Sequence, residues 1–498
     1  MIILGVGTAV LCVVTIGLLV ARKVGGDADN YLLAGRSLGL PLVAVALAAQ
    51  AVDSNATAGN TDLAFEFGFW AGASLPVGLA LCLLITGVFF AKPMNRMKLV
   101  TLPDYYRLRF GRGIEVAASL IMIACFAILL AGNLVAVGLM LEHFTGLSYT
   151  AGVLVVVALI LTYTIAGGMY SDVYTALAQT VLTLVAVAAL TTWMALTHGL
   201  SIPEGMGPLD LGQLTDPAQG APVNLATLLA LGIGDIIAID FMQRIFAARS
   251  PRTAQRACFA GAGITLAVGV PFALVALSSV SVLGDDVEGP VLFALLDGTA
   301  PALLAVLVLS GLVTASFTTA SGVILSTAAV AVRNIRGQRR GTDLSSAQVL
   351  RFTRYTMVPM ALLGVVFALR VPQTGILLTL AFDLMLAGLA VPFILGMAWR
   401  RGGGAAATAA LVVGLGSRLA MFALTPTVYG ADNDLLYLSG GPAVPDLDGW
   451  STMIASGASL AAYTVVALLR PAAPPAITAP EPTAPVEEGA EYASKAGA

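Results

Sequence analysis

Charged residues are scarce in this chain, and the residues of metal and thiol chemistry are scarcer still. Asp, Glu, Lys and Arg make up 11% of its 498 residues, whereas about a quarter is usual in soluble domains. The four cysteines fall within predicted helices without metal-ligand spacing, and the two histidines lie near predicted loops, which argues against a zinc site and a thiol or histidine enzyme. The sequence contains no glycine-rich phosphate loop, and its net charge of −3 gives no indication of nucleic-acid binding. We therefore expect neither an enzyme nor a nucleic-acid partner.

Long apolar stretches take up most of the chain instead. Apolar residues amount to 58% and the mean hydropathy is positive, a composition that predicts an integral membrane protein. A helix crosses a hydrocarbon core of about 30 Å with roughly 20 apolar residues. Thirteen stretches are suitable, at 2–21, 39–60, 69–91, 114–141, 148–166, 172–196, 223–243, 257–283, 302–332, 355–371, 374–398, 404–425 and 451–469. We expect an all-α transmembrane domain over residues 1–470 and a disordered cytoplasmic tail over 471–498.

Basic residues gather in alternate predicted loops, which sets an orientation. These loops contain Arg22, Lys92, Arg249, Arg333 and Arg400, among others. The opposite loops carry acids such as Glu204 and Asp216. Because basic loops stay in the cytoplasm, we predict an outside N-terminus and a cytoplasmic C-terminus in the plasma membrane. Arg418 breaks the pattern within crossing 404–425, and we expect its side chain to snorkel to the outer interface rather than to contact a ligand.

Polar residues interrupt the second crossing, 39–60. The stretch begins as an apolar helix and then contains Gln50, Asp53 and Asn55. An ionisable side chain at the centre of a spanning helix costs roughly 2.5–3.5 kcal/mol, so it usually faces a water-filled path or a binding cavity. The alternative is a helix that ends near Gln50 and leaves Asp53 in an outer loop. We favour a broken span, because the polar run is too short to close one membrane helix and start another.

The seventh crossing, 223–243, contains a matching interruption at Gly232, Gly234 and Asp235. Glycine alone can serve close helix packing, but an acid beside paired glycines indicates a break that lines a site. Crossings 2 and 7 run in opposite directions because they lie five crossings apart. Secondary transporters often pair two inverted five-helix units around broken helices at the membrane midplane. We predict such repeats at about 39–196 and 223–398.

Hydroxyl groups cluster in the ninth crossing, 302–332. Ala315, Thr318 and Thr319 lie at i, i+3 and i+4, so both hydroxyls and a backbone carbonyl share one helix face. We call these three residues the oxygen set. Neutral oxygens suit a hard monovalent cation such as sodium. The alternative is structural: Ser and Thr also return hydrogen bonds to their own helix or join neighbouring helices.

The chain resembles the sodium/solute symporter family over about residues 30–415. The resemblance is carried by YLLAGRSLG (31–39), TLPDYYRLRFG (101–111), YTIAGG (163–168) with Asp172 and Gln179, QRIFAA (243–248), and PFILGMAWRR (392–401) before Gly404 and Ala405. It implies a leucine-transporter-type 5+5 inverted-repeat core. It also implies symport of a small organic solute with sodium by alternating access.

The resemblance further implies where sodium binds. The family's common site combines backbone oxygens of the first core helix with Ala-x-x-(Ser/Thr)-(Ser/Thr) of the eighth, and the oxygen set matches the second element in register. An ungapped alignment from Gly39 assigns the carbonyls to Ala49 and Val52. An alignment anchored on Asp53, an acid that some family members carry, would instead assign the carbonyls to Ala51 and Ser54. We take Ala49 and Val52 as the prediction.

Acids in the seventh crossing set the chain apart from sugar-transporting relatives, which offer aromatic and amide groups there. Asp235 and Asp240 precede Gln243 and Arg244. These acids could attract an amine, bind a second cation or carry a proton. For Asp240 we prefer an ion pair with Arg244 at i+4, which makes the two residues a candidate cytoplasmic gate.

Further candidates for the solute or coupling site are Gln50, Asp53 and Asn55 in crossing 2 and Asp383 in crossing 11. For Asp383 two interpretations stay open, a cavity acid and a polar link between helices. The predicted function is sodium-coupled symport of a small polar organic solute in a lipid membrane. Its rivals are a proton-coupled transporter and a membrane sensor that binds solute without moving it. Neither the solute nor the oligomeric state follows from the sequence.

Overall fold

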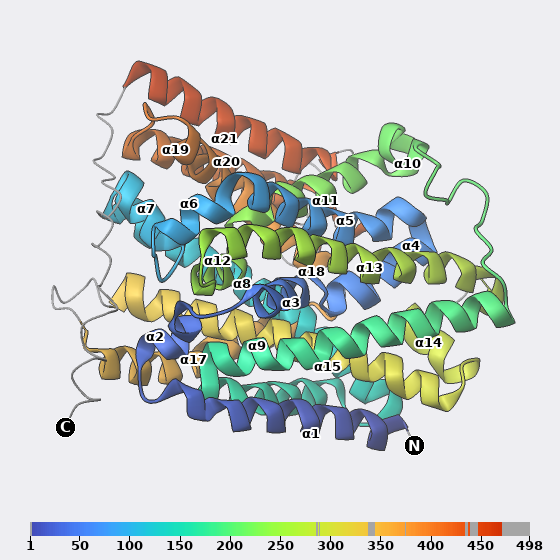
Figure 1. Ribbon diagram of the computed structural model, residues 1–498. Helices are drawn as coiled ribbons and strands as arrows, with labels where there is room; N and C mark the ends of the chain where they lie inside the picture. The colour runs from blue at the N-terminus through green and yellow to red at the C-terminus, as the bar shows by residue number, and fades with distance from the viewer. Residues whose placement is uncertain are drawn as a thin grey trace, which may run out of the picture.

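The computed structural model describes residues 2–284, 287, 289–336, 344–373, 375–433, 437–438 and 447–470. The tail predicted to be disordered, 471–498, lies outside the described residues. Nearly everything else is helical (Figure 1). Because the membrane interior offers no water to backbone groups, a chain of this composition is expected to satisfy them within helices.

The helices of the first half fill residues 2–247. They are α1 (Ile2–Val20), α2 (Ala28–Leu33), α3 (Leu40–Ala51), α4 (Asn60–Phe67), α5 (Phe69–Ile85), α6 (Ala91–Arg96), α7 (Pro103–Phe110), α8 (Arg112–Thr145), α9 (Tyr149–Thr197), α10 (Gly212–Thr215), α11 (Ala221–Ile233) and α12 (Ile239–Ala247).

The second half adds the remaining helices and a small hairpin. They are α13 (Pro251–Leu283), α14 (Val291–Gly298), α15 (Ala302–Val330), α17 (Ser346–Arg370), α18 (Ile376–Met385), α19 (Val391–Ala398), α20 (Gly404–Leu424) and α21 (Trp450–Leu469), with strands β1 (Thr427–Val428) and β2 (Ala431–Asp432). The strands pair antiparallel, with Thr427 opposite Asp432.

The described helices are long and apolar enough to cross a membrane many times. Ten qualify singly, and up to eleven if α11 and α12 form one bent span. Counting α9 as two crossings and the interrupted α3–α4 segment as another would reach the thirteen predicted, a number that itself remains a prediction. The multi-pass, all-α architecture is confirmed.

Gly168 interrupts α9 and explains why one helical segment can serve two crossings. Its backbone has φ 51° and ψ −132°, which is not helical. An unbroken helix of 49 residues would measure roughly 73 Å, more than twice the hydrocarbon thickness. A Cβ at this position would also collide with the carbonyl oxygen of Tyr31. Glycine therefore meets both the positive φ and the close approach.

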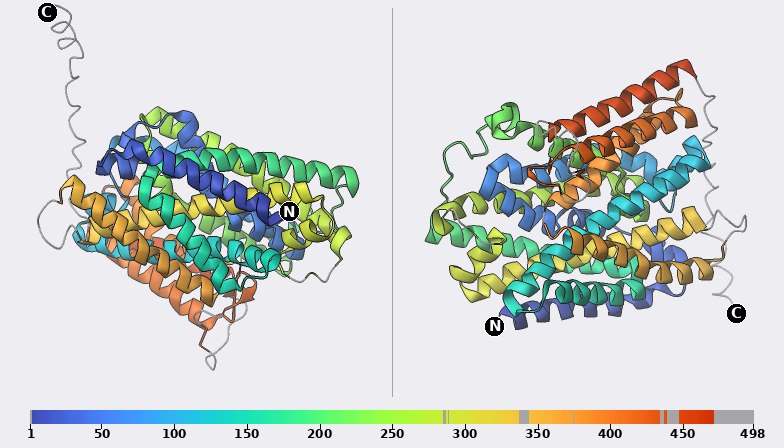
Figure 2. Two further views of the ribbon diagram at one scale, coloured as in Figure 1. Left: turned by 90° about the horizontal axis from the view of Figure 1, so that it is seen from below. Right: turned by 180° about the vertical axis from the view of Figure 1, so that it is seen from behind.

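The outermost helices expose large apolar side chains, as a lipid-facing surface requires. Leu4 and Leu11 on α1, Leu362 on α17, Val412 on α20 and Leu469 on α21 are each at least half exposed. Figure 1 shows α1 and α21 at opposite edges of the bundle, and Figure 2 gives the same arrangement from below and from behind. The central helices α3, α8, α15 and α18 lie between these edges.

The two ends of the bundle differ in charge, and we name them accordingly. The basic end carries α2 and α7, and the acidic end carries α10 and α14, at left and right in Figure 1. Arg22 and Arg107 lie at the basic end, whereas Glu204 and Asp216 lie at the acidic end.

Candidate functional site

The second span is broken, as predicted. Helix α3 ends at Ala51, and Val52 leaves helical geometry with φ −105° and ψ 74°. A π-helical turn over Asn55–Gly59 then leads into α4. Asp53 is 1% exposed, so the alternative that placed it in an outer loop is wrong.

Asp53 satisfies the backbone that this break frees. Its carboxylate accepts hydrogen bonds from the backbone N–H of Ala56 (2.9 Å), from Nδ2 of Asn55 (2.8 Å) and from Nδ2 of Asn133 on α8 (2.7 Å). The Thr57 hydroxyl donates to the Asp53 carbonyl over 2.7 Å. A carboxylate at a helix start accepts orphan N–H groups in this way. Asp53 and Asn55 therefore hold the half-helix in place and fasten it to α8.

The seventh span is also broken where the glycines and the acid occur. Helix α11 ends at Ile233, a 3-10 turn covers Gly234–Ile237, and Ala238 is extended with φ −60° and ψ 122°. Helices α11 and α12 meet at 46°. A Cβ on Gly234 would collide with the carbonyl oxygen of Phe382, so glycine lets α18 approach this break closely.

The first break and the ninth crossing meet at the oxygen set. The Thr319 hydroxyl donates to the carbonyl oxygen of Ala49 over 3.1 Å. Nε2 of Gln50 donates to the carbonyl oxygen of Thr318 over 3.2 Å. The hydroxyl of Thr318 returns to its own helix, at the carbonyl of Thr314 (3.0 Å). The two elements predicted to share a cation are therefore in direct contact.

These oxygens lie in a dry, enclosed place. Ala49, Thr318, Thr319 and Ala315 are 0% exposed, and Val52 is 3% exposed. The observed hydrogen bonds are of the structural kind, since Thr318 bonds within its helix and Thr319 bonds across to α3, and the cation site stays a prediction.

Arg244 has a different partner from the one predicted. Its Nη2 forms a buried ion pair with Oδ2 of Asp172 on α9, at 2.5 Å. Its contact with Asp240 is from Nη1 to the backbone carbonyl, at 2.8 Å. The Asp240 carboxylate instead accepts the N–H of Phe241. The predicted Asp240–Arg244 carboxylate ion pair is wrong, because Asp240 lies in the first turn of α12 and its side chain turns back to cap that turn.

The Asp172–Arg244 pair adjoins the oxygen set. The Ser321 hydroxyl on α15 donates to the other carboxylate oxygen of Asp172 over 2.8 Å. A Cβ on Gly322 would contact Nη2 of Arg244 and Oε1 of Gln50. The pair thus links α9, α12 and α15 within one helical turn of Thr318. Sequence reasoning named Asp172 within a motif but gave it no role.

Asp383 is a link between helices. Nε of Arg418 on α20 donates to its Oδ2 over 2.5 Å, with both side chains buried. Arg418 is 3% exposed, so the expected snorkelling is wrong. A guanidinium with a carboxylate beside it gains more from that partner than from reaching the interface.

Asp235 stands apart from these paired acids. It is 1% exposed, and neither carboxylate oxygen accepts a hydrogen bond of regular geometry from a described residue. The polar group beside it is the thiol of Cys82 on α5, a weak donor.

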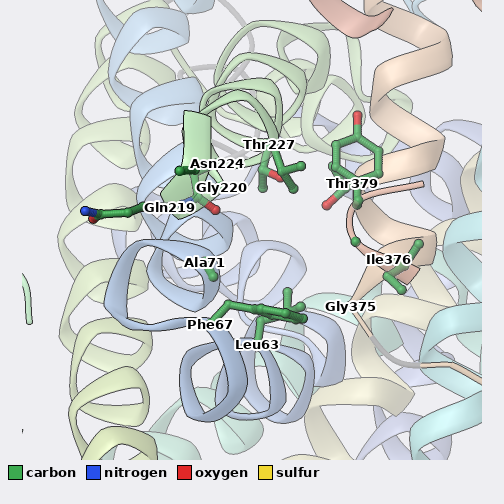
Figure 3. Close-up of a pocket in the computed structure, with 14 residues that line it drawn as sticks. Leu63, Phe67, Ala71, Gln219, Gly220, Asn224, Thr227, Gly375, Ile376 and Thr379 are labelled. Atoms are coloured by element: carbon green, nitrogen blue, oxygen red, sulfur yellow. The ribbon is translucent and has the colours of Figure 1, made fainter. Parts of the chain in front are cut away.

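A cavity lies between the breaks in the second and seventh spans and the acidic end of the bundle. It has a volume of about 320 Å³ and is lined from α4, α11 and α18 and from the β1–β2 turn (Figure 3). Its lining includes Phe67, Thr227, Thr379 and Tyr429. No charged residue lines it among the described part of the chain.

The basic end is closed by contrast. Leu38 donates its N–H to the carbonyl of Ala247 (3.2 Å) and accepts from the N–H of Arg249 (3.0 Å). Nδ2 of Asn95 donates to the carbonyls of Ile245 (2.8 Å) and Ala248 (2.9 Å). These bonds fasten the end of α12 to the segment before α3 and to α6.

A family model described as the sodium:solute symporter family matches residues 31–414. The chain belongs to this family. Among curated relatives, it is 23% identical over 397 residues to a high-affinity choline transporter of Drosophila melanogaster, covering 75% of this chain and 63% of that one. It is 24% identical over 435 residues to an osmoregulated proline transporter of Bacillus subtilis, covering 83% and 87%.

A third relative is a sodium/glucose cotransporter of Vibrio parahaemolyticus, 26% identical over 291 residues that cover 53% of this chain and 52% of that one. The match therefore spans less than two thirds of the choline and glucose transporters.

Solved structures show that the chain shares its fold with transporters. A sodium-coupled sialic acid symporter in a substrate-bound outward-open state superposes with a TM-score of 0.77 at 16% identity, covering 95% of this chain and 98% of that one. Mhp1, a nucleobase-cation-symport-1 transporter in a closed conformation, gives a TM-score of 0.54 at 16% identity over 89% and 95%. The leucine-transporter-type fold predicted from the sequence is confirmed, and family and fold are those of transporters.

Proposed function

We propose that this symporter carries a small polar organic solute together with sodium, driven by the sodium gradient across the plasma membrane. The observation that supports it most is the 3.1 Å contact between the Thr319 hydroxyl and the Ala49 carbonyl. At this distance two oxygens can serve one small cation, and hard cations prefer such neutral or anionic oxygens. The proposed ligands are Ala49, Val52, Ala315, Thr318 and Thr319.

Sodium bound there would join α3 to α15. Helix α3 is part of the second span, one of the two broken spans, whereas α15 packs against α8 and α9. A cation bound between them stabilises the conformation in which its ligands converge. It shifts the population of conformations only because it binds that conformation more tightly than the others. The proposed cycle begins with the basic end closed and the cavity at the acidic end accessible.

The proposed orientation places the basic end in the cytoplasm and the N-terminus outside. It rests on the alternation of basic and acidic loops. Solute would then enter through the cavity at the acidic end, reach the two breaks at Val52 and Gly234, and leave past α12 when the basic end opens.

Uptake into proteoliposomes tests this function. Radiolabelled choline, proline and glucose, the solutes of the named relatives, would be offered under an inward sodium gradient, and under an inward proton gradient without sodium. We expect accumulation of at least one solute that requires sodium and collapses with a sodium ionophore. Accumulation driven by protons alone would support the proton-coupled alternative, and binding without accumulation would support a sensor.

A further inference from the structure

Asp235 lacks the partners that other acids within the core possess. Asp172 has Arg244, Asp383 has Arg418, and Asp53 has three N–H donors. Asp235 is as deeply buried as these, yet its two carboxylate oxygens have no regular hydrogen bond within the described chain. An ionised carboxylate in such a place carries a large desolvation cost. Whenever Asp235 is ionised, its negative charge is therefore uncompensated by the described protein and would be stabilised by a positive group.

The surroundings make that deficit larger. The charged side chains that act electrostatically on Asp235 are Asp240 and Asp53, both acids. The guanidinium of Arg244, on the next helix, is already engaged by Asp172. No described base compensates Asp235 from within the protein.

The proposed function routes the solute past the break that contains Asp235. Asp235 lies in the Gly234–Ile237 turn that interrupts the seventh span. Thr227, which lines the cavity at the acidic end, precedes it by eight residues. Eight residues correspond to roughly 12 Å along a helix, so the break lies about two turns beyond the part of α11 that lines the cavity. Figure 3 shows Thr227 and Thr379 facing the cavity from α11 and α18.

The approach suits an organic cation. The cavity lining combines the rings of Phe67 and Tyr429 with neutral polar groups and no described charge. Aromatic faces attract ammonium groups. A bare metal ion would need several oxygens around Asp235, whereas the polar group found there is the Cys82 thiol, a poor ligand for hard cations. An ammonium group brings its own carbon substituents and tolerates such neighbours.

We propose that Asp235 binds a positively charged group, a protonated amine or quaternary ammonium, on the transported solute. This inference rests on the proposed symport function and specifies its substrate class. It makes Asp235 a specificity-determining residue, separate from the sodium ligands of α3 and α15.

Thermal unfolding of the purified full-length protein in saturating sodium tests the proposal, with choline and methylammonium as cationic probes and glucose as an uncharged one. We expect a cationic probe to raise the unfolding temperature of the wild type and glucose to leave it unchanged. In Asp235→Asn, the probe concentration that gives half of the maximal rise in unfolding temperature should increase on the order of tenfold or more, because a charge-assisted contact is lost.

Asp297→Asn is the matched control, since it removes one exposed acid (59% exposed) at the acidic end. It should respond to the probes like the wild type. Asp235→Asn removes an unpaired charge with almost no change of shape, so it should fold. Asp235→Glu, which keeps the charge, should retain measurable probe binding and provides a second variant.

The outcomes separate this inference from the proposed function. If sodium raises the unfolding temperature of the wild type but neither cationic probe does, Asp235 does not bind an organic cation. Equal probe affinity in wild type and Asp235→Asn leads to the same conclusion, as does proton-driven uptake that Asp235→Asn abolishes. If sodium itself has no effect on the wild type, the proposed function fails instead.

Discussion

At the scale of single residues, what distinguishes the buried acids is the partner each one has. Asp53 caps a half-helix, Asp172 and Asp383 each face an arginine, and Asp235 has no regular partner among the described residues. Local sequence gave the position of each acid but not its role. The role depends on a side chain that is distant in the chain, 72 residues away for Asp172 and 35 for Asp383. The rule for i and i+4 pairs therefore assigned Arg244 to Asp240 incorrectly.

Thr319→Ala and Thr318→Ala test the oxygen set in transport. Each should raise the sodium concentration for half-maximal uptake by roughly ten- to a hundredfold, the equivalent of about 1.5–3 kcal/mol for a polar contact to a charge. Membrane insertion should not change. Thr327→Ala is the control, because it removes a threonine hydroxyl from the same helix about two turns beyond Thr319, where it bonds to the carbonyls of Val323 and Ile324. Sodium activation like that of the wild type in both variants would exclude these hydroxyls as ligands.

Asp383→Asn should destabilise the protein without altering sodium affinity. It leaves the buried Arg418 guanidinium uncompensated, and breaking one side of a buried pair costs about 3–5 kcal/mol. Unfolding of the purified protein in detergent measures the loss. The double variant Asp383→Leu with Arg418→Met should recover much of it, because no buried charge remains. Full stability of Asp383→Asn alone would refute the structural role.

At the scale of secondary-structure elements, the breaks within the second and seventh spans matter more for the proposed site than the number of crossings. Glycine and polar residues predicted the breaks in both spans. Such residues destabilise an apolar membrane helix and are tolerated where freed backbone groups line a site. The stretches 148–166 and 172–196 were predicted as separate crossings, and α9 leaves helical geometry between them at Gly168. The sequence did not indicate that a single non-helical residue, rather than a loop, connects the two crossings.

Gly168→Ala should lower the free energy of unfolding by about 1–3 kcal/mol, because alanine must adopt a positive φ and its methyl group meets Tyr31. Gly263→Ala on α13 is the control. A Cβ there meets nothing within 4 Å, and alanine favours a helix by up to about 1 kcal/mol. Equal unfolding temperatures for the two variants would show that the bend at Gly168 is not required.

At the scale of the whole molecule, the structure has an accessible acidic end and a closed basic end. The sequence predicted the fold and the charge alternation, because both follow from composition and helix breaks. It could not indicate which end is closed, since that depends on contacts such as Asn95 to Ile245 and Leu38 to Ala247. These contacts join segments that are far apart in the chain.

Cysteine labelling tests this asymmetry. In a background with Cys12→Ser, which removes the exposed native cysteine, Thr227→Cys should react with a membrane-impermeant thiol reagent added from outside in sodium. Gln243→Cys should not react, because Gln243 lies outside the cavity lining and is bonded to the Leu32 carbonyl at the closed basic end. Rapid labelling of Gln243→Cys from the cytoplasmic side, with Thr227→Cys protected, would mean that the opposite end is the open one in the membrane.

Binding of radioactive sodium to the purified protein tests the central claim most directly. We predict saturable binding to the wild type that is lost in Thr319→Val, which replaces the hydroxyl by a methyl group of similar volume, and that is retained in Thr327→Val. Sodium binding of equal affinity in Thr319→Val and the wild type would contradict a cation site between α3 and α15.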